Sequence, residues 1–465
     1  MPAKYHIHAH AAPPRFPTEG KLGIVDWRED CSSCHNCVKK GCVYGFYREE
    51  TDLLRDDIGY LDYIYKCKGC LTCIQNCTKN ILTRVVNPEY ERLGDEYFRP
   101  DIILTTWYQA ETGAVPVSGC GYGGPFSGSG FDSMWTDMSE IVRPTRDGIH
   151  GREYINTSVD IGRKLKRLNF SGDTITDTVP PLLSSPLPLM FDMVAEQWRH
   201  PVILSAMVKV AAELKLFAII DSEVLAGMSV EERAPVIPLF TGTDPVREAA
   251  GAQAPMIILP DSENILETVK ECKSQNSQRI VAVRVTAGTD SFKRVTELAG
   301  NGVEVINLRF DSHGREEAGK QRHMRDVIRE VHGELIRQGL RDEVTLFTSG
   351  GIALPEHMAK AIICGTDLVA IDIPLIVALE CRLCGQCALG GQCSIGLATI
   401  DEHYAVSRMI NLMGSWHSQL LEMLGAMGIR EARRLRGEVG RCMFFEDLER
   451  AAFGRLFGKR LDRKN

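Results

Sequence analysis

Cysteine is the residue type whose spacing carries most of the chemistry in this chain. Sixteen cysteines are present, and twelve of them fall into three tight clusters. Cysteines in series at two-residue intervals, with a further one along the chain, are typical of iron–sulfur ligands, whereas zinc sites favour separated pairs. Zinc is therefore the alternative, and the spacing favours iron–sulfur clusters. Outside the clusters lie Cys120, Cys272, Cys364 and Cys442.

The first two clusters, CSSCHNC and CKGCLTCIQNC, match the pattern of bacterial ferredoxins with two clusters. In that pattern the fourth cysteine of each run binds the other cluster. Two departures are that the first run ends after four intervening residues rather than three, and that neither fourth cysteine precedes proline. We predict two [4Fe–4S] clusters with crossed ligands. One set is Cys31, Cys34, Cys37 and Cys77, and the other is Cys67, Cys70, Cys73 and Cys42.

The third cluster follows a segment suited to a phosphate group. Residues 348–373 read as a strand end, a Gly-Gly turn, a helix and a second buried strand. Backbone N–H groups and a helix N-terminus in that setting bind anions. A phosphate site directly followed by Cys381, Cys384, Cys387 and Cys393 indicates a flavin nucleotide beside an iron–sulfur centre, and hence a redox protein. Because a Gly-Gly pair also serves as a plain turn into a helix, a barrel that has lost its flavin is the alternative.

Eight short apolar runs alternate with helical patterns between Leu187 and Ile373. This alternation predicts an α/β fold, a (β/α)8 barrel with its active face at the carboxyl ends of the strands. The predicted divisions are an N-terminal tail (1–25), a ferredoxin-like module (26–90), a bridging region (91–185), the barrel (186–380), and the third cysteine loop with a helical extension (381–465). The segment 179–189 is predicted to be a linker into the barrel.

Composition excludes several classes of protein. A formal charge of -7 leaves no basic surplus for nucleic acid. No apolar run is long enough to predict a transmembrane helix, and the N-terminus lacks a signal-peptide pattern. We therefore expect a cytoplasmic protein, where many cysteines indicate metal binding rather than disulfides.

The order of barrel, TSGG turn, LVAID strand, cysteine cluster, CSIGLAT and LLEMLGAMGI resembles the synthase domain of the glutamate synthase large subunit, in its short archaeal-type form. The resemblance implies FMN on the C-terminal face of the barrel. Its phosphate would be held by Ser349, Gly350 and Gly351 and by the backbone around Asp372 and Ile373. Arg284 stands where the family has a lysine near flavin and substrate; arginine keeps the positive charge but does not donate a proton. The family's third cluster is [3Fe–4S], and the four cysteines here leave [4Fe–4S] open.

Two segments depart from the family pattern. RFDSHGREEAG (309–319) replaces its glycine-rich segment after the sixth strand, and FDMVAEQW (191–198) stands after the first strand in place of a Met-Ser-Gly-Ala type. The Met-Pro start predicts that no glutaminase domain is present.

The resemblance implies an iron–sulfur flavoenzyme that passes electrons through its clusters to FMN. The family reaction converts 2-oxoglutarate and ammonia to L-glutamate. Ferredoxin or an FAD- and NAD(P)H-dependent subunit would be the redox partner, within a larger complex. The alternative is a non-catalytic or substrate-divergent electron-transfer subunit.

Overall fold

The computed structural model describes residues 5–16, 21–26, 34, 38–43, 70–115, 130–136, 155–225, 227–242 and 254–457. Within them, eight parallel strands close a barrel in the spatial order β10-β11-β12-β13-β14-β15-β8-β9. This confirms the predicted (β/α)8 barrel, and each predicted apolar run supplies one strand. The strands are β8 (Leu189–Phe191), β9 (Ala218–Asp221), β10 (Val236–Leu239), β11 (Met256–Pro260), β12 (Ile280–Thr286), β13 (Val305–Arg309), β14 (Thr345–Ser349) and β15 (Leu368–Ile371).

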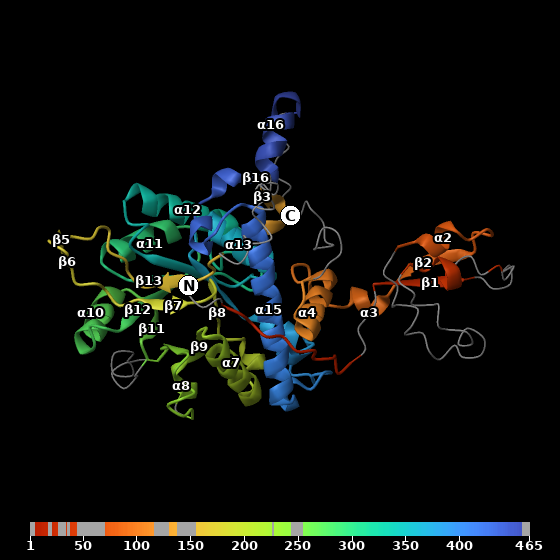
Figure 1. The fold of residues 1–465 in the computed structure, drawn as a ribbon, viewed down its shortest axis with the longest axis horizontal. Helices are drawn as coiled ribbons and strands as arrows, with labels where there is room; N and C mark the ends of the chain where they lie inside the picture. Colours follow the sequence, from red (N-terminus) through yellow and green to blue (C-terminus); the bar gives the residue numbers. More distant parts are fainter. Residues whose placement is uncertain are drawn as a thin grey trace.

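Helices between the strands cover the outside of the barrel (Figure 1). The longer helices bury an apolar face, as the helical spacing of their apolar residues predicts, whereas the short α8 buries no residue and all of α14 is buried. Cys272 and Cys364 lie on two of these faces and are fully buried. The helices are α7 (Pro201–Leu214), α8 (Ser222–Leu225), α10 (Ile265–Gln275), α11 (Ser291–Gly300), α12 (Met324–Arg337), α13 (Pro355–Cys364) and α14 (Ile373–Ala378).

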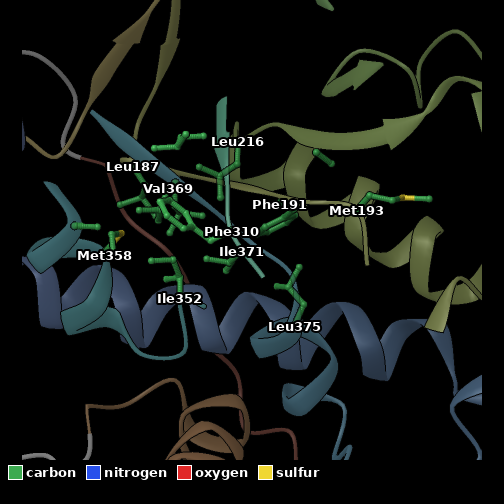
Figure 2. Close-up of a cluster of buried hydrophobic side chains, with 14 of the residues drawn as sticks. Leu187, Phe191, Met193, Leu216, Phe310, Ile352, Met358, Val369, Ile371 and Leu375 are labelled. Atoms are coloured by element: carbon green, nitrogen blue, oxygen red, sulfur yellow. The ribbon is translucent and has the colours of Figure 1, made fainter. Parts of the chain in front are cut away.

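Alternate residues of the strands face opposite sides of the barrel wall, and the two sides form separate cores. Met190, Phe347 and Ala370 belong to the interior cluster. Phe191 and Ile371 belong to the outer cluster. Figure 2 shows Phe191, Ile371 and their neighbours beside the long helix α15 (Glu402–Ala426). The interior of the barrel is therefore packed with apolar side chains, and the polar side chains of the candidate site lie at its C-terminal end.

A short antiparallel pair closes the other end of the barrel. β4 (Val159–Ile161) pairs with β7 (Leu183–Ser185), and Val159 and Ile161 join the interior cluster. Gly162 donates its N–H to the hydroxyl of Thr345, the first residue of β14, over 3.1 Å. The segment predicted to be a linker thus contains a strand that seals the N-terminal end of the barrel.

The cysteine-rich N-terminal module lies apart from the barrel (Figure 1). Its described elements are β1 (Leu22–Asp26), paired antiparallel with β2 (Leu82–Val86), and the short helices α1 (Val38–Gly41) and α2 (Thr72–Gln75). The pairing of β1 extends the module to Leu22, four residues before the predicted boundary. α3 (Pro88–Glu91) and α4 (Pro100–Thr112) lead from the module back to α15.

Several smaller elements complete the described chain. The remaining strands are β3 (Met134–Thr136), which pairs with β16 (Cys442–Phe444), and the hairpin of β5 (Phe170–Ser171) and β6 (Thr174–Ile175). Helical turns are η3 (Gly130–Ser133), η6 (Glu196–Trp198), η7 (Gln386–Leu389), η8 (Leu397–Thr399), η9 (Ala432–Leu435) and η10 (Val439–Arg441), and α16 (Phe445–Phe457) ends the described chain. In the part of the chain described here, no helix is long and apolar enough to cross a membrane.

Residues 5–16, which belong to the N-terminal tail predicted from the sequence, make specific contacts with the rest of the chain. Ala12 is buried and donates its N–H to the carbonyl of Glu111 over 2.9 Å. Asn411 of α15 donates to the carbonyl of His10 over 2.6 Å and accepts from its N–H over 3.0 Å. The segment is therefore bound along α15 and the end of α4.

Candidate functional site at the barrel mouth and the cysteine loops

Four polar side chains meet at the C-terminal end of the barrel interior. Arg284, Asn307 and Ser349 come from β12, β13 and β14, and Asp192 directly follows β8. Each stands two residues beyond an apolar side chain of the interior cluster, so the strand alternation directs it inward. Those apolar side chains are Ala282, Val305, Phe347 and Met190. The two-residue alternation of the strands thus brings these four side chains together in one polar layer.

Arg284 is the centre of this layer. Its Nη2 donates to Asp192 over 2.6 Å, and its Nε donates to the side-chain oxygen of Asn307 over 2.6 Å. The side chains of Arg284 and Asp192 are only 7% and 4% exposed. Asn307 in turn donates to the Ser349 hydroxyl over 3.2 Å. The network fixes the guanidinium plane across the mouth of the barrel.

One nitrogen of Arg284 is left for a ligand. Its Nη1 is buried and has no hydrogen-bond partner. A buried donor without a partner is rare in native proteins, because its desolvation is not compensated. The arrangement fits a ligand that presents a carbonyl oxygen or a delocalised negative charge, as the pyrimidine edge of a flavin does.

Asp372 is a second carboxyl group at the mouth, and it is partly buried. It caps the N-terminus of α14, and its Oδ1 accepts the N–H of Ile373 over 2.6 Å. Burial, followed by the negative charge of Asp192, raises the pKa of Asp372 to about 6. The backbone around Asp372 and Ile373 is part of the phosphate site that the sequence predicts. The carboxylate already uses the Ile373 N–H there, and its charge would oppose a phosphate.

Replacing Asp372 with asparagine is expected to stabilise the protein above pH 6. The contribution of Asp372 to wild-type stability falls as pH rises from about 4 to about 6, because its carboxyl group ionises in the unfolded chain before it ionises in the folded protein. Asparagine still caps the helix and carries no charge. The gain over wild type should grow to about 3 kcal/mol at pH 8 and vanish near pH 4. Urea unfolding at the two pH values measures it.

Asp401→Asn is the matched control for that experiment. Asp401 also caps a helix, accepting the N–H of Tyr404 over 2.8 Å, but it is exposed. No comparable gain at pH 8 is expected there. An Asp372→Asn gain that is equal at pH 4 and pH 8 would show that Asp372 carries no ionisation penalty.

The Gly-Gly turn after β14 is packed against another loop. Gly350 and Gly351 have φ of +87° and +67°. A Cβ on Gly350 would lie 2.3 Å from the Phe310 carbonyl oxygen, and one on Gly351 would lie 2.2 Å from the Gly314 nitrogen. Tyr97 donates its hydroxyl proton to the Gly351 carbonyl. The close approach of the loop after β13 therefore accounts for both glycines, independently of any ligand.

Aromatic residues that the sequence did not single out surround this turn. His323 caps α12 through Nδ1, and burial lowers its pKa to about 3, so it is neutral. Its ring stands edge-on to Phe131, with centroids 4.9 Å apart, and His313 stacks on Tyr97 at 5.4 Å. These residues lie far apart in sequence, and no local pattern marks them. By contrast, Asn307 was detectable as a polar residue inside an apolar strand.

The third cysteine loop begins at the end of α14, a helix of six residues that spans about 9 Å. Cys381 is buried, Cys387 and Cys393 are partly buried, and Cys384 is exposed. Cys387 and Cys393 share a side-chain hydrogen bond, and backbone N–H groups of residues 395–397 lower the pKa of Cys393. N–H groups directed at a thiolate are typical of iron–sulfur ligands. Among the described residues, no three Cys, His, Asp or Glu side chains are arranged to hold one metal ion.

Two contacts in the N-terminal module join a cysteine to the sequence neighbour of another cysteine in its predicted crossed set. Cys34 Sγ lies 3.9 Å from the hydroxyl of Thr78, the neighbour of Cys77. The backbone N–H of Val43, the neighbour of Cys42, is one of the groups that lower the pKa of Cys70, after the stronger contributions from Thr72. Cys31, Cys37 and Cys67 lie outside the described residues. The donor chemistry and the two crossings fit a module with two clusters.

Comparisons with known proteins agree with the resemblance found in the sequence. Residues 253–430 match the family described as a conserved region in glutamate synthase. The archaeal glutamate synthase [NADPH] of Archaeoglobus fulgidus is 24% identical over 93% of this chain and 96% of its own length. The archaeal-type glutamate synthase [NADPH] of Dehalococcoides mccartyi is 23% identical, over 89% and 93%. A solved structure of a mandelate oxidase mutant with an FMN adduct matches with a TM-score of 0.38 and 15% identity, over 64% of this chain and 98% of the other.

Proposed function

We propose that this chain, a member of the glutamate synthase family, is an oxidoreductase that passes electrons through three iron–sulfur clusters to FMN at the mouth of its barrel. The observation that carries the proposal is the covalent path from Asp372, through α14, to Cys381: the third cysteine loop starts directly beside the barrel mouth. The crossed contacts of Cys34 and Cys70 support the two N-terminal clusters.

Side chains at the barrel mouth would hold the proposed FMN. Arg284 would bind the flavin ring through its free Nη1, while Asp192 and Asn307 keep its guanidinium in place. The predicted phosphate site at Ser349, Gly350 and Gly351 is covered by the backbone of Phe310 and Gly314, so the contact with Arg284 is the part of the FMN site that the residues present support. Bound FMN would couple one-electron transfer from the clusters to two-electron hydride transfer to the substrate.

The protein residues would orient the reactants rather than donate protons. Arginine side chains do not serve as general acids, so Arg284 would act as an electrostatic partner. Among the described residues at the mouth, Asp372 is the carboxyl group whose pKa of about 6 allows it to hold or release a proton near neutrality.

The proposed overall reaction is that of the family. 2-Oxoglutarate, ammonium, two electrons and two protons give L-glutamate and water. The electrons come from a redox partner, reduced ferredoxin or an FAD subunit that oxidises NAD(P)H, in a multi-subunit complex. Cytoplasmic location belongs to the same proposal, because the ligand thiols must stay reduced.

Anaerobic purification followed by cofactor and activity measurements tests the proposal. We expect about 12 iron atoms and one FMN per chain, or about 11 iron atoms if the third cluster is [3Fe–4S]. Glutamate should form from 2-oxoglutarate and ammonium with a chemically reduced ferredoxin. Protein that binds neither iron nor flavin would contradict the proposal.

A second function is favoured by the charges at the mouth. Arg284 is already paired with Asp192, and Asp372 adds a second, partly buried carboxyl group. The two carboxyl groups outnumber the guanidinium group of Arg284, so the charge at the mouth opposes the binding of a dianionic substrate such as 2-oxoglutarate. The second candidate function is therefore that of an electron-transfer subunit that acts on a different substrate or on none. Its signature is flavin and cluster reduction with no glutamate formed.

A further inference from the structure

The connection between α14 and the third cysteine loop is held in an unusual backbone conformation. Glu380, directly before Cys381, has φ of +72° and is buried. A residue with a Cβ adopts this left-handed conformation only when the surrounding contacts enforce it. The contacts around Glu380 therefore decide where the loop starts and where the Cys381 thiol lies.

The N–H groups of Glu380 and Cys381 donate to the carbonyls of Val377 and Ile376 over 2.9 and 3.3 Å, which closes the end of α14 around Glu380. Glycine is usual at this position, and here the side chain of Glu380 is held from the other end of the sequence. Arg15 donates from its backbone N–H to one carboxylate oxygen of Glu380 and from Nε to the other, each over 2.7 Å. Its Nη2 donates to the carbonyl of Leu379 over 3.3 Å. The N–H of Phe16 adds a longer bond of 3.4 Å to the same carboxylate. The side chain of Glu380 is 5% exposed and that of Arg15 is 27% exposed, so water competes weakly for this pair.

A second arginine fixes the same turn from the other side. Arg408 of α15 is fully buried and donates from Nε to the carbonyl of Ala378, the last residue of α14. Its Nη1 donates to the carbonyl of Ala12 over 2.9 Å. Cations at the last carbonyls of a helix satisfy acceptors that have no partner within the helix. Arg408 thus joins the end of α14 to the segment that carries Arg15.

We propose that Arg15 is a positioning residue for the third iron–sulfur cluster. It holds Glu380 in the left-handed conformation, and Glu380 in turn places Cys381 at the start of the cysteine loop. The inference rests on the proposed function, because it needs a cluster in that loop. The N-terminal segment is then part of the cluster site, although it lies more than 360 residues away from it in sequence.

The test separates this role from simple anchoring of the N-terminal segment. Glycine adopts φ near +70° without strain, so it removes the need for Arg15. The full-length variants are Arg15→Ala, Glu380→Gly and the double variant, purified without oxygen. The signal of the third cluster is assigned in low-temperature EPR spectra as the one that Cys387→Ala removes. Iron per chain is measured in parallel.

The expected result is loss of the third-cluster signal and of about three to four iron atoms in Arg15→Ala. Glu380→Gly should keep the cluster, and the double variant should regain it. Tyr5→Phe is the control, because it removes a hydrogen bond of 2.9 Å from the same segment to Leu214 without touching Glu380. It should leave the cluster intact.

Three outcomes overturn the inference. An intact cluster in Arg15→Ala shows that Arg15 does not position it. Loss of the cluster in the double variant shows that Arg15 acts through the whole segment rather than through Glu380. A wild-type protein without a third cluster removes the proposed function together with the inference, and is distinguished from the first two by its own iron content.

Discussion

Arg284→Met is expected to destabilise the protein by about 3–5 kcal/mol, the range for a buried ion pair that loses one partner. Methionine fills a similar volume, so the loss reports charge rather than packing. The Asp192 carboxylate, 4% exposed, would remain buried beside Asp372 without a cation. The flavin ring would also lose its proposed partner, so FMN per chain should fall. Urea unfolding of anaerobically purified protein measures the first effect, and flavin absorbance measures the second.

Two further variants identify the cause. Asp192→Asn combined with Arg284→Met removes both charges, and it should recover a large part of the lost stability, as expected for coupled partners. Arg199→Met breaks an ion pair of 2.8 Å with Asp221 near the same end of the barrel, where Arg199 is 39% exposed. That pair should contribute no more than about 1 kcal/mol. Equal effects of Arg284→Met and Arg199→Met would show that Arg284 is not held as a buried ion.

The barrel could be predicted because its signals are local. Each apolar run is short, each is followed by a turn or a helix, and the eight strands lie where the runs lie. The strand β7 was misread because its sequence, LSS between prolines, resembles a linker. Its role depends on pairing with β4 at the base of the barrel, a contact that no local pattern encodes.

The two segments that depart from the family pattern prove informative in the structure. The segment after β8 supplies Asp192, which pairs with Arg284. The segment after β13 supplies Phe310 and Gly314, whose backbone fills the space above the Gly-Gly turn. The sequence showed that these loops differ, but only the fold shows that both differences act on the barrel mouth. Asp192 adds a charge to the mouth, and the loop after β13 adds backbone above the Gly-Gly turn. The resemblance to the family implies neither feature.

The contacts of the N-terminal segment could not be predicted for a related reason. Proline and histidine near a terminus are typical of a tail, but they do not indicate what the tail binds. The residues that bind the segment, Asn411, Arg408 and Glu380, lie about 400 residues away. Long-range polar contacts of this kind leave no periodic signal in the segment itself.

Cysteine-to-alanine variants, made singly and in pairs, are expected to reveal the crossed ligand sets of the N-terminal module through the iron content of each variant. Cys34→Ala and Cys77→Ala should each remove one cluster, about four iron atoms per chain. If the two cysteines bind the same cluster, the double variant should lose no more iron than either single variant. Cys70→Ala with Cys77→Ala should instead lose about eight, because these residues bind different clusters despite lying seven residues apart.

Pairing within each run predicts the opposite pattern, so iron analysis alone decides between them. In that case the Cys34 and Cys77 double variant loses both clusters, and the Cys70 and Cys77 double variant loses one. The contact of Cys34 with Thr78 and that of Cys70 with the N–H of Val43 favour the crossed pattern. Cys42→Ala supplies an independent check, since it should add nothing to the loss in Cys70→Ala. The crossing matters for function because each run of cysteines then supplies ligands to both clusters, which places the two clusters close together for electron transfer.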